Sequence, residues 1–344
     1  MKVKLIICGF GKVGQAFAEL LENKKGKLKN QFNLEVCMVC VIDLFGAATI
    51  QRKDVCIPLR SLLAFVKQGG RVDQFPSLGE EGFKGEQAIL ETEADVLVET
   101  TPTNIVTGEP GLTHIRAALK RKMNVISANK GPLVLKFKEL NSLAKKQGVQ
   151  LRFGAATAAA LPTVDLGYYC LAGTEIIKIE GILNGTTNYI LTRMHDSGCS
   201  LEEALSEAQN MGIAEKNPRL DLEGWDTANK LILIANKLFG CNLSLSEVKV
   251  KGILDVTGKE VLDAKRQGKV IKLIGKVSRE EKKIIACVSP ELLSTEHPLC
   301  TVKGAEKGIT FTTESMGKIT VTGGKSSPRG AAAALLRDLI NIYR

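Results

Sequence analysis

The sequence has 344 residues, 44% of them hydrophobic and 24% charged, which is typical of a globular chain with a sizeable core and room for two domains. It contains no run of about 18 apolar residues and no secretory signal pattern, so we expect no membrane partner and a cytoplasmic protein. The net charge of +10 would attract polyanions, but the lysines are dispersed and the densest run, Lys24–Lys29, has no interleaved aromatic residues, so we expect no nucleic-acid partner.

The first third of the chain alternates short apolar runs with helical patterns. The apolar runs, interpreted as strands, are 3–8, 36–42, 95–99, 124–127 and 150–153. Helical patterns alternate with them at 16–21, 59–67, 114–122 and 136–147. Strands that alternate with helices predict a Rossmann-like, doubly wound parallel sheet of the α/β class.

The middle of the chain predicts a second, α+β domain. A long β-branched strand over 175–183 is followed by a loop or helix start at 184–188, and a capping box, Ser200 with Glu203, opens a helix over 201–211 that Gly212 ends. Another helical pattern covers 225–239, and short strands are expected within 272–288.

The end of the chain, a strand at 318–321 and a helix over 329–342, is expected to return to the first domain. We therefore predict a dinucleotide-binding domain at 1–135 plus 318–344, and a catalytic and dimerisation domain at 136–317.

The loop after the first strand carries the pattern G-x-G-x-x-G. A lone match could be an ordinary glycine turn, but here a strand precedes the motif and a helix follows it. Glycines allow the tight turn and let a pyrophosphate approach the helix N-terminus. The predicted cofactor residues are Gly9, Phe10, Gly11, Lys12, Val13 and Gly14.

Asp43 ends the second strand, where an acid would bind the ribose hydroxyls. It lies 29 positions after Gly14, further than the usual ~20, and we interpret the hydrophilic stretch 23–33 as a surface insertion that explains the excess. Asp43 could also be a plain strand-end turn residue. Because Arg52 and Lys53 could reach a 2′-phosphate, we expect either NAD or NADP as cofactor.

An acidic segment leads into the second helical pattern of the middle region. Glu215, Asp221, Glu223 and Asp226 lie within a dozen residues and are followed by Lys230. Asp226 and Lys230 are four positions apart and share a helix face, a spacing that an ordinary surface ion pair also has. The Gly- and Pro-bearing acidic loop in front, and a dinucleotide motif in the same chain, favour a substrate site.

This segment resembles the signature of the homoserine dehydrogenase family. The matching positions are Ala208, Gly212, Pro218, Asp221, Gly224, Asp226 and Lys230. Other stretches are similar to the family too: ETTPTN at 99–104, TGEPGLTHI at 107–115, SANKGPL at 127–133, GILNGTTNYIL at 181–191 and VTGG at 321–324. The resemblance covers essentially the whole chain.

The resemblance implies a homodimeric enzyme that reversibly reduces L-aspartate 4-semialdehyde to L-homoserine with NAD(P)H, in threonine and methionine biosynthesis. It implies that Lys130 and Lys230 flank the reacting carbonyl, with Lys230 as proton donor, and that Glu215 and Asp226 hold the ammonium and carbonyl end of the substrate. It places Asp221, Gly185 and Thr186 at the substrate and Thr101, Pro102 and Thr103 near the nicotinamide. The resemblance is to the short form, so we expect no threonine feedback through an appended domain.

The loop 154–162 departs from the family pattern. Gly154 replaces an acid that can help to bind a monovalent cation, and alanines replace glycines. Backbone carbonyls could still form a cation site, and a changed loop could change the substrate. Two alternatives therefore stay open: a related dehydrogenase for another small aldehyde, and a non-catalytic NAD-binding regulatory homologue.

The cysteines and histidines predict no metal site. Nine cysteines are scattered along the chain, and Cys8, Cys37, Cys40 and Cys170 lie in apolar runs, which is typical of reduced, buried thiols in an intracellular protein. Cys37 and Cys40 form a C-x-x-C, but inside a continuous buried strand and without a second pair at finger spacing. The histidines His114, His195 and His297 are dispersed, so we interpret them as structural or surface residues.

Overall fold

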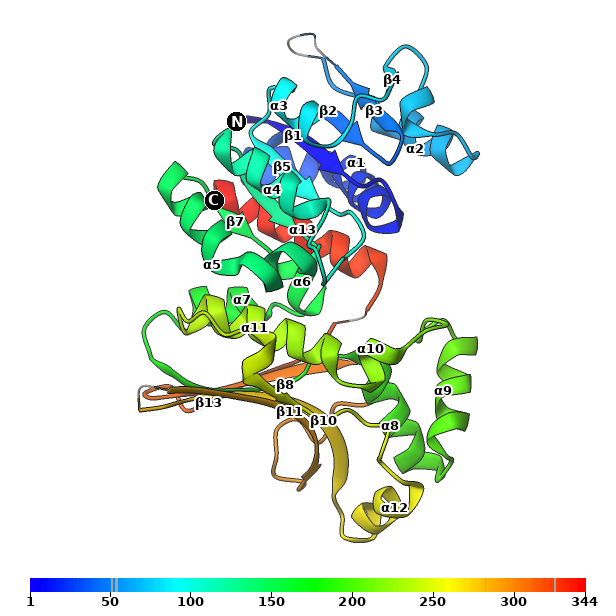
Figure 1. Ribbon diagram of the computed structural model, residues 1–344, viewed down its shortest axis with the longest axis vertical. Helices are drawn as coiled ribbons and strands as arrows, with labels where there is room; N and C mark the ends of the chain where they lie inside the picture. The colour runs from blue at the N-terminus through cyan, green and yellow to red at the C-terminus, as the bar shows by residue number, and fades with distance from the viewer. Residues whose placement is uncertain (51, 53–54, 282, 325) are drawn as a thin grey trace. The chain divides into compact units, whose positions relative to one another are not determined.

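The computed structural model describes residues 1–50, 52, 55–281, 283–324 and 326–344 and divides into two compact units (Figure 1). Unit 1 comprises Met1–Ala156 and Ser327–Arg344, and unit 2 comprises Thr157–Ser326. The prediction assigned 136–156 to the second domain and 318–326 to the first. The structure instead has 136–156 in unit 1 and 318–326 in unit 2. Across the described ranges, no helix is both long and apolar enough to cross a membrane.

Unit 1 is built on a seven-stranded sheet of order β4-β3-β2-β1-β5-β6-β7. Its parallel strands are β1 (Lys2–Cys8), β2 (Glu35–Ile42), β5 (Val96–Glu99), β6 (Asn124–Ser127) and β7 (Leu151–Arg152). These strands confirm the predicted doubly wound sheet. Two antiparallel strands next to β2, β3 (Gly46–Thr49) and the edge strand β4 (Gly79–Glu81), were not predicted, because they are short and have no apolar run or alternation.

Helices flank this sheet. They are α1 (Lys12–Phe32), α2 (Leu59–Lys67), α3 (Gly85–Glu91), α4 (Gly111–Lys120), α5 (Lys130–Gln147) and α13 (Pro328–Tyr343), and α6 (Gly154–Ala158) crosses the unit boundary. α1 packs beside α13, and α4 beside α5 (Figure 1). The stretch 23–33, predicted as a surface insertion, is mostly exposed and is helical: α1 continues through it to Phe32, Leu28 is buried, and Asn33 caps the helix in a left-handed conformation.

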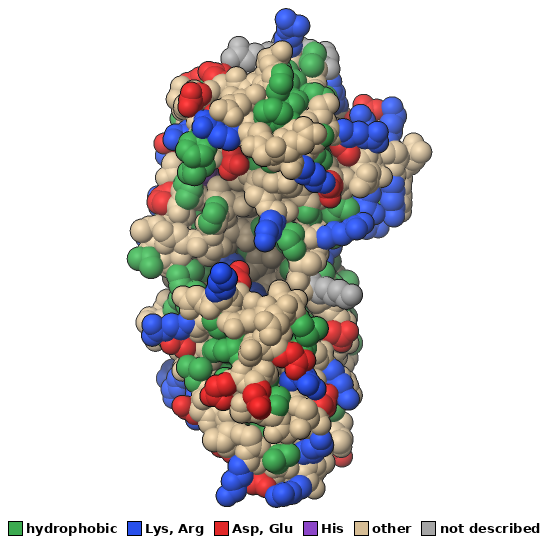
Figure 2. Space-filling model, turned by 90° about the vertical axis from the view of Figure 1, so that its right-hand side faces the viewer, with side chains coloured by type: hydrophobic (Ala, Val, Ile, Leu, Met, Phe, Trp, Pro, Cys, Tyr) green, Lys and Arg blue, Asp and Glu red, His purple; other side chains and the backbone are tan. Residues whose placement is uncertain are grey.

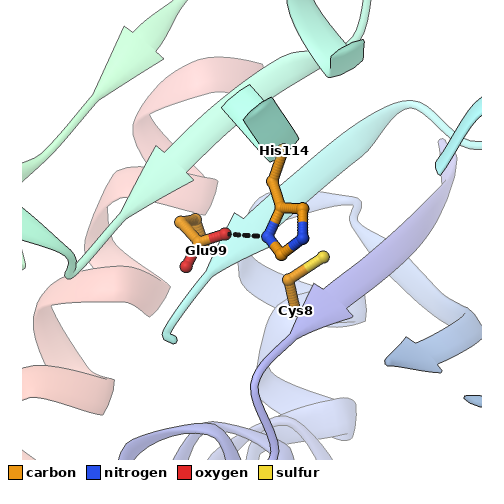
Figure 3. A group of neighbouring side chains, drawn as sticks. All are labelled: Cys8, Glu99 and His114. Carbon is orange, nitrogen blue, oxygen red and sulfur yellow. Dashed lines mark hydrogen bonds and ion pairs between the residues drawn. The ribbon is translucent and has the colours of Figure 1, made fainter. Parts of the chain in front are cut away.

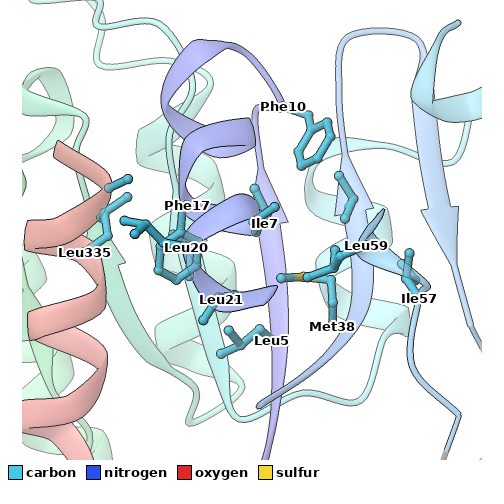
Figure 4. Close-up of a cluster of buried hydrophobic side chains, with 14 of the residues drawn as sticks. Leu5, Ile7, Phe10, Phe17, Leu20, Leu21, Met38, Ile57, Leu59 and Leu335 are labelled. Carbon is cyan, nitrogen blue, oxygen red and sulfur yellow. The ribbon is translucent and has the colours of Figure 1, made fainter. Parts of the chain in front are cut away.

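The core of unit 1 lies between the sheet and these helices. Figure 4 shows Leu5 and Ile7 of β1 facing Phe17 and Leu21 of α1, with Leu335 of α13 closing one side. Each of these five side chains is buried. Burying one such side chain contributes about 1.5–3 kcal/mol, so this layer fixes β1 and the start of α1.

Unit 2 is built on a six-stranded sheet of order β13-β12-β8-β10-β11-β9. The strands are β8 (Ile176–Ile182), β9 (Val248–Val250), β10 (Val270–Glu280), β11 (Lys283–Leu293), β12 (Lys307–Thr313) and β13 (Lys318–Gly323). Strands are present within 272–288 as predicted, but they are not short, because β10 and β11 pair as one long antiparallel ladder. The predicted return of strand 318–321 to unit 1 is wrong, because β13 pairs with β12; only α13 belongs to unit 1.

The helices of unit 2 include the predicted ones. They are α7 (Thr163–Asp165), α8 (Gly185–Ser197), α9 (Leu201–Asn210), α10 (Arg219–Leu222), α11 (Trp225–Leu238) and α12 (Gly258–Arg266). The capping box of Ser200 and Glu203 is present at the start of α9, as predicted. α11 packs on β10 at Gly275, where a Cβ would lie 3.0 Å from the methyl group of Thr227.

Two cysteine predictions are wrong. Cys37 forms a disulfide with Cys56, and their Cα atoms are 5.2 Å apart. The amide of Ile57 donates to the carbonyl of Met38 at 2.8 Å, so the segment before α2 runs beside β2 and brings the two sulfur atoms together. Cys170 is exposed rather than buried.

Charged side chains of both signs are spread over the surface. On the face that Figure 2 shows, Lys and Arg side chains are interspersed with Asp and Glu. The excess of positive charge is therefore not gathered into a single field on that face.

Candidate active site

The predicted cofactor residues lie at the carboxyl ends of adjacent parallel strands. β2, β1, β5 and β6 are neighbours in that order; Cys8 of β1 pairs with Ile42 on one side and Glu99 on the other. The chain runs from β1 to β2 on one side, and β5 lies on the other, so the strand order reverses at β1. Sheets of this type bind their ligands at such a reversal point.

The glycine motif forms the turn between β1 and α1. Gly9 has a φ of +89°, and a Cβ there would lie 2.8 Å from the backbone of Thr100. A Cβ at Gly14 would lie 2.3 Å from the carbonyl oxygen of Gly9, so the turn can pack this closely only without side chains. The remaining motif residues are the buried Phe10, the half-buried Val13 and the exposed Gly11 and Lys12.

The start of α1 suits an anion. Apart from Gly11 and its chain neighbours, no described atom lies within 4 Å of the position that a Cβ of Gly11 would take, and the N-cap makes no side-chain hydrogen bond to the helix. Its first turn contains no acidic residue. Unpaired amides and the positive end of the helix dipole together favour a phosphate group at this point.

Asp43 directly follows β2 and lies beside the glycine turn, because the amide of Gly9 donates to the carbonyl of Ile42 at 2.8 Å. The amide of Asp43 donates to the carbonyl of Gly46 at 2.9 Å, which closes a turn and leaves the side chain exposed. Arg52 is also exposed, and Lys53 lies outside the described residues. An exposed carboxylate at this edge is well placed for ribose hydroxyls.

The segment Thr101–Thr103 follows β5. Both the amide and the hydroxyl of Thr101 donate to Oε1 of Glu99, the amide at 2.8 Å. The hydroxyl of Thr100 donates to the carbonyl of Gly9 at 2.6 Å, which holds this segment against the glycine turn. Thr101 is half-buried, whereas the other two residues of the segment are exposed.

Lys130 is the first residue of α5, at the carboxyl end of β6. The side chain of Asn129 caps the helix, because its Oδ1 accepts a hydrogen bond from the amide of Gly131 at 3.1 Å. The amide of Ala128 donates to the carbonyl of Glu99 at 2.9 Å. Lys130 therefore lies at the same edge of the sheet as Thr101.

Unit 2 holds the acidic residues and the second lysine. Nζ of Lys230 lies 2.5 Å from Oδ2 of Asp226 and donates to the carbonyl of Leu183 at 2.9 Å. Both side chains are only 12% exposed. Nδ2 of Asn184 donates to Oδ2 of Asp226 at 2.8 Å and to Oδ1 of Asp221 at 2.7 Å, so one amide connects both carboxyl groups.

The charges of this cluster are not balanced. Burial raises the pKa of Asp221, and the nearby charge of Asp226 raises it further, while Lys230 acts in the opposite direction. Among the described contacts, Asp221 and Asp226 both lie beside the ammonium group of Lys230 in a largely buried place. A further cation, such as the ammonium group of an amino acid, would relieve the repulsion between the two acids.

Gly185 and Thr186 open α8 next to this cluster. A Cβ at Gly185 would lie 2.7 Å from the carbonyl oxygen of Ala305, which explains the glycine. The hydroxyl of Thr186 donates to the carbonyl of Ile213 at 3.2 Å. Glu215 is exposed in the loop that follows Ile213, and its carbonyl accepts from the side chain of Gln209 at 3.2 Å.

The segment 154–162, predicted as a loop, begins with α6 and has charged partners that its sequence does not show. The amide of Gly154, where the family can have an acid, donates to Oδ2 of Asp338 on α13 at 2.8 Å. In unit 2, Lys307 is 2% exposed, and its ammonium group donates to the carbonyl of Ala158 at 3.1 Å. The buried ammonium group of Lys307 therefore contacts the backbone of this segment.

Several residues of these clusters were not predicted. One is Asn184, whose side chain bonds both Asp221 and Asp226 and which lies in the stretch GILNGTTNYIL. An Asn between a strand and a helix is typical of an N-cap, and this was the signal that could have indicated its role. Glu99, His114 and Asn129 are buried polar residues of unit 1. The apolar run 95–99 ends in Glu, and this pattern could have indicated Glu99.

Two family models match the chain. One, described as homoserine dehydrogenase, matches residues 162–340, and the other, the homoserine dehydrogenase NAD-binding domain, matches residues 9–154. The chain is 41% identical to the homoserine dehydrogenase of Methanocaldococcus jannaschii, covering 98% of each chain. It is 35% identical to the NAD(+)-dependent homoserine dehydrogenase of Pseudomonas canavaninivorans, covering 99% of this chain and 96% of that one. The crystal structure of S. aureus homoserine dehydrogenase is similar with a TM-score of 0.76 and 29% identity, covering 99% of this chain and 78% of that one.

Proposed function

The chain belongs to the homoserine dehydrogenase family, and on this premise we propose that it catalyses the reversible NAD(P)-dependent reduction of L-aspartate 4-semialdehyde to L-homoserine. This reaction serves threonine and methionine biosynthesis. The observation that carries the proposal is the largely buried cluster of Lys230, Asp226, Asp221 and Asn184, which pairs a proton donor with acids that suit an ammonium group.

Lys230 is the proposed proton donor. Reduction of an aldehyde leaves negative charge on its oxygen, and a neighbouring ammonium group both stabilises that charge and supplies the proton. The contacts with Asp226 and with the carbonyl of Leu183 hold Nζ of Lys230 in a fixed direction. Lys130 is proposed as the second catalytic lysine, with its place at the start of α5 set by the Asn129 cap.

The substrate's ammonium group is assigned to the acidic side of unit 2. We assign Glu215 and Asp226 to the ammonium and carbonyl end, and Asp221, Gly185 and Thr186 to the walls around the substrate. The support is that Asn184 bonds two largely buried acids, Asp221 and Asp226, and that Thr186 is bonded to the loop that carries Glu215.

The dinucleotide site fits its cofactor. Gly9 and Gly14 allow the closely packed turn, a Cβ at Gly11 would face open space, and the first turn of α1 has no acid. These residues would hold the pyrophosphate, Asp43 the ribose, and Thr101, Pro102 and Thr103 the nicotinamide side. NAD(P)H, when bound, supplies the hydride; the protein orients it and provides the proton.

We also propose a homodimer in the cytoplasm, where a biosynthetic enzyme that depends on a dinucleotide meets its cofactor. For a protomer of 37.1 kDa, sedimentation equilibrium should give twice that mass at micromolar concentration. A mass that stays at 37.1 kDa across the concentration range would contradict the dimer.

A substrate panel tests the function directly. NAD(P)H absorbance is followed with L-homoserine, other small hydroxy amino acids and simple alcohols, each with NAD and with NADP. The proposal requires L-homoserine to have the highest kcat/KM. A preference for another substrate would favour the alternative of a related NAD(P)-dependent dehydrogenase for another small aldehyde. Dinucleotide binding with no turnover of any substrate would favour the non-catalytic regulatory homologue.

A further inference from the structure

Unit 1 contains a buried cluster of ionisable side chains that the proposed reaction does not use. Figure 3 shows Cys8 at the end of β1, Glu99 at the end of β5 and His114 on α4, with their polar ends directed toward one another. Their ligand atoms all lie within 4.8 Å of one another, and the three residues are 0%, 0% and 5% exposed. Burying a carboxyl group costs free energy unless hydrogen bonds or charges compensate it, so the partners of Glu99 are informative.

The hydrogen bonds of Glu99 show what it does. Oε2 lies 2.8 Å from Nδ1 of His114, and Oε1 accepts from both the amide and the hydroxyl of Thr101. Both oxygen atoms of the carboxyl group are therefore used by donors from α4 and from the segment after β5. Hydrogen bonds to a charged acceptor are roughly twice as strong as neutral ones.

The network continues beyond Thr101. Because the hydroxyl of Thr101 donates to Glu99, its oxygen accepts from Nδ2 of Asn129 at 3.1 Å. The same amide nitrogen lies 3.4 Å from the carbonyl of Pro102, and Oδ1 of Asn129 accepts from the amide of Gly131. Asn129 is 1% exposed, so each of its bonds is protected from water.

We propose that Glu99 is a positioning residue which, braced by His114, fixes the Thr101–Pro102 segment and, through Asn129, the start of α5 that carries Lys130. The inference rests on the proposed function, because the segment is assigned to the nicotinamide and Lys130 to the carbonyl. One buried carboxylate thereby sets the position of two parts of the proposed site, Thr101 and Lys130, which lie 29 positions apart in sequence.

The same cluster has the residue types of a metal site, but its bonding favours the positioning role. Both oxygen atoms of Glu99 already accept hydrogen bonds, and Nδ1 of His114 is used by Glu99. Burial raises the pKa of the Cys8 thiol, and the nearby charge of Glu99 raises it further, so the thiolate that a metal requires is disfavoured.

The test compares matched pairs of variants in the full chain. Glu99→Ala removes the carboxylate. Glu99→Gln keeps an oxygen atom that accepts from Thr101, and its side-chain NH2 can donate to Nδ1 of His114 in the tautomer whose Nδ1 carries no proton. Thr101→Val removes the hydroxyl that joins Glu99 to Asn129, and Thr101→Ser restores it. Glu86→Gln, an exposed acid on α3, is the control for loss of one charge.

The readouts are kcat, its isotope effect with 4-deuterated NADH, the dissociation constant of NADH and the unfolding temperature. A misplacement of about 1 Å can cost ~10²-fold in rate, so Glu99→Ala and Thr101→Val should lose at least ~10-fold in kcat, with a larger isotope effect as hydride transfer becomes rate-limiting. Glu99→Gln and Thr101→Ser should recover most of the rate.

Several results would overturn the proposal. One is a Thr101→Val variant with wild-type kcat and isotope effect; because this change is isosteric, it answers the question even if Glu99→Ala does not fold. Another is rate loss that follows unfolding temperature alone, equally in the conservative variants. A third is one zinc ion per chain in the wild type that Cys8→Ala releases.

The outcome can be separated from that of the proposed function. If the wild type oxidised no homoserine, the proposed function would fail, while the NADH dissociation constants would still test the network. Weaker NADH binding by Thr101→Val than by Thr101→Ser would support it, and equal binding would oppose it.

Discussion

At the scale of single residues, Lys230 is where the proposed chemistry concentrates. Removing its ammonium group removes the proton donor and the charge that stabilises the developing alkoxide. Because general acid catalysis contributes ~10²–10⁴-fold, Lys230→Ala should lose at least ~10² in kcat and still bind NADH. Lys259→Ala, at an exposed position of the same unit, should keep wild-type kinetics. If Lys230→Ala keeps a near-normal kcat across pH, Lys130 becomes the candidate proton donor.

Asp43 should decide between the two cofactors. Its exposed carboxylate beside the glycine turn can accept hydrogen bonds from the ribose hydroxyls, and it repels a 2′-phosphate. Asp43→Ser should therefore shift the ratio of kcat/KM for NAD and NADP toward NADP. The exposed Glu80→Ser serves as the matched control. An unchanged ratio would show that Asp43 is a turn residue and not the ribose ligand.

At the scale of elements, a buried lysine joins β10 to α8. Nζ of Lys272 donates to Oδ1 of Asn188 at 2.9 Å, the hydroxyl of Thr192 at 3.1 Å and the carbonyl of Val302 at 2.7 Å. Burial lowers the pKa of Lys272 from 10.5 to about 8, an effect that Lys303 increases and Asp196 opposes. These hydrogen bonds hold the ammonium group in place. The packing of α8 on the sheet offsets the free-energy cost of burying that charge.

This shift predicts a pH dependence of stability. Between pH values of about 8 and 10.5 the folded chain has released the proton of Lys272 while the unfolded chain still binds it. The free energy of unfolding should therefore rise with pH in that window, by on the order of 3 kcal/mol for this group. Denaturant unfolding of wild type and Lys272→Met at pH 7.5 and 9.5 measures the difference. Parallel pH profiles would mean that Lys272 does not titrate there.

At the scale of the whole molecule, the disulfide between Cys37 and Cys56 is the covalent feature that sequence patterns did not predict. The other seven cysteines are free. After unfolding without a reductant, iodoacetamide should modify seven cysteines, and nine after reduction. Because the bond closes a loop between residues 19 positions apart, reduction should lower the free energy of unfolding by about 3 kcal/mol. Cys56→Ser should show no response to reductant, and nine modified cysteines before reduction would contradict the bond.

The sequence by itself determined the features that depend on neighbours along the chain. The turn formed by the glycine motif, the capping box of α9 and the strand and helix patterns around β1, β2 and β6 are local, and the structure confirms them. The fold class follows from their alternation. The family follows from motifs spread over the whole chain, which the family models match.

Only the tertiary structure decided which distant residues meet. Asn184 joins Asp221 to Asp226, Glu99 joins His114 to Thr101, and Cys56 reaches Cys37, each across a gap with no periodicity to reveal it. Similarly, β13 pairs with β12 in unit 2 although the helix after it belongs to unit 1. The physical reason is that strand pairing and buried polar contacts are settled by the packing of the whole unit, whereas propensity and periodicity report only on the local chain.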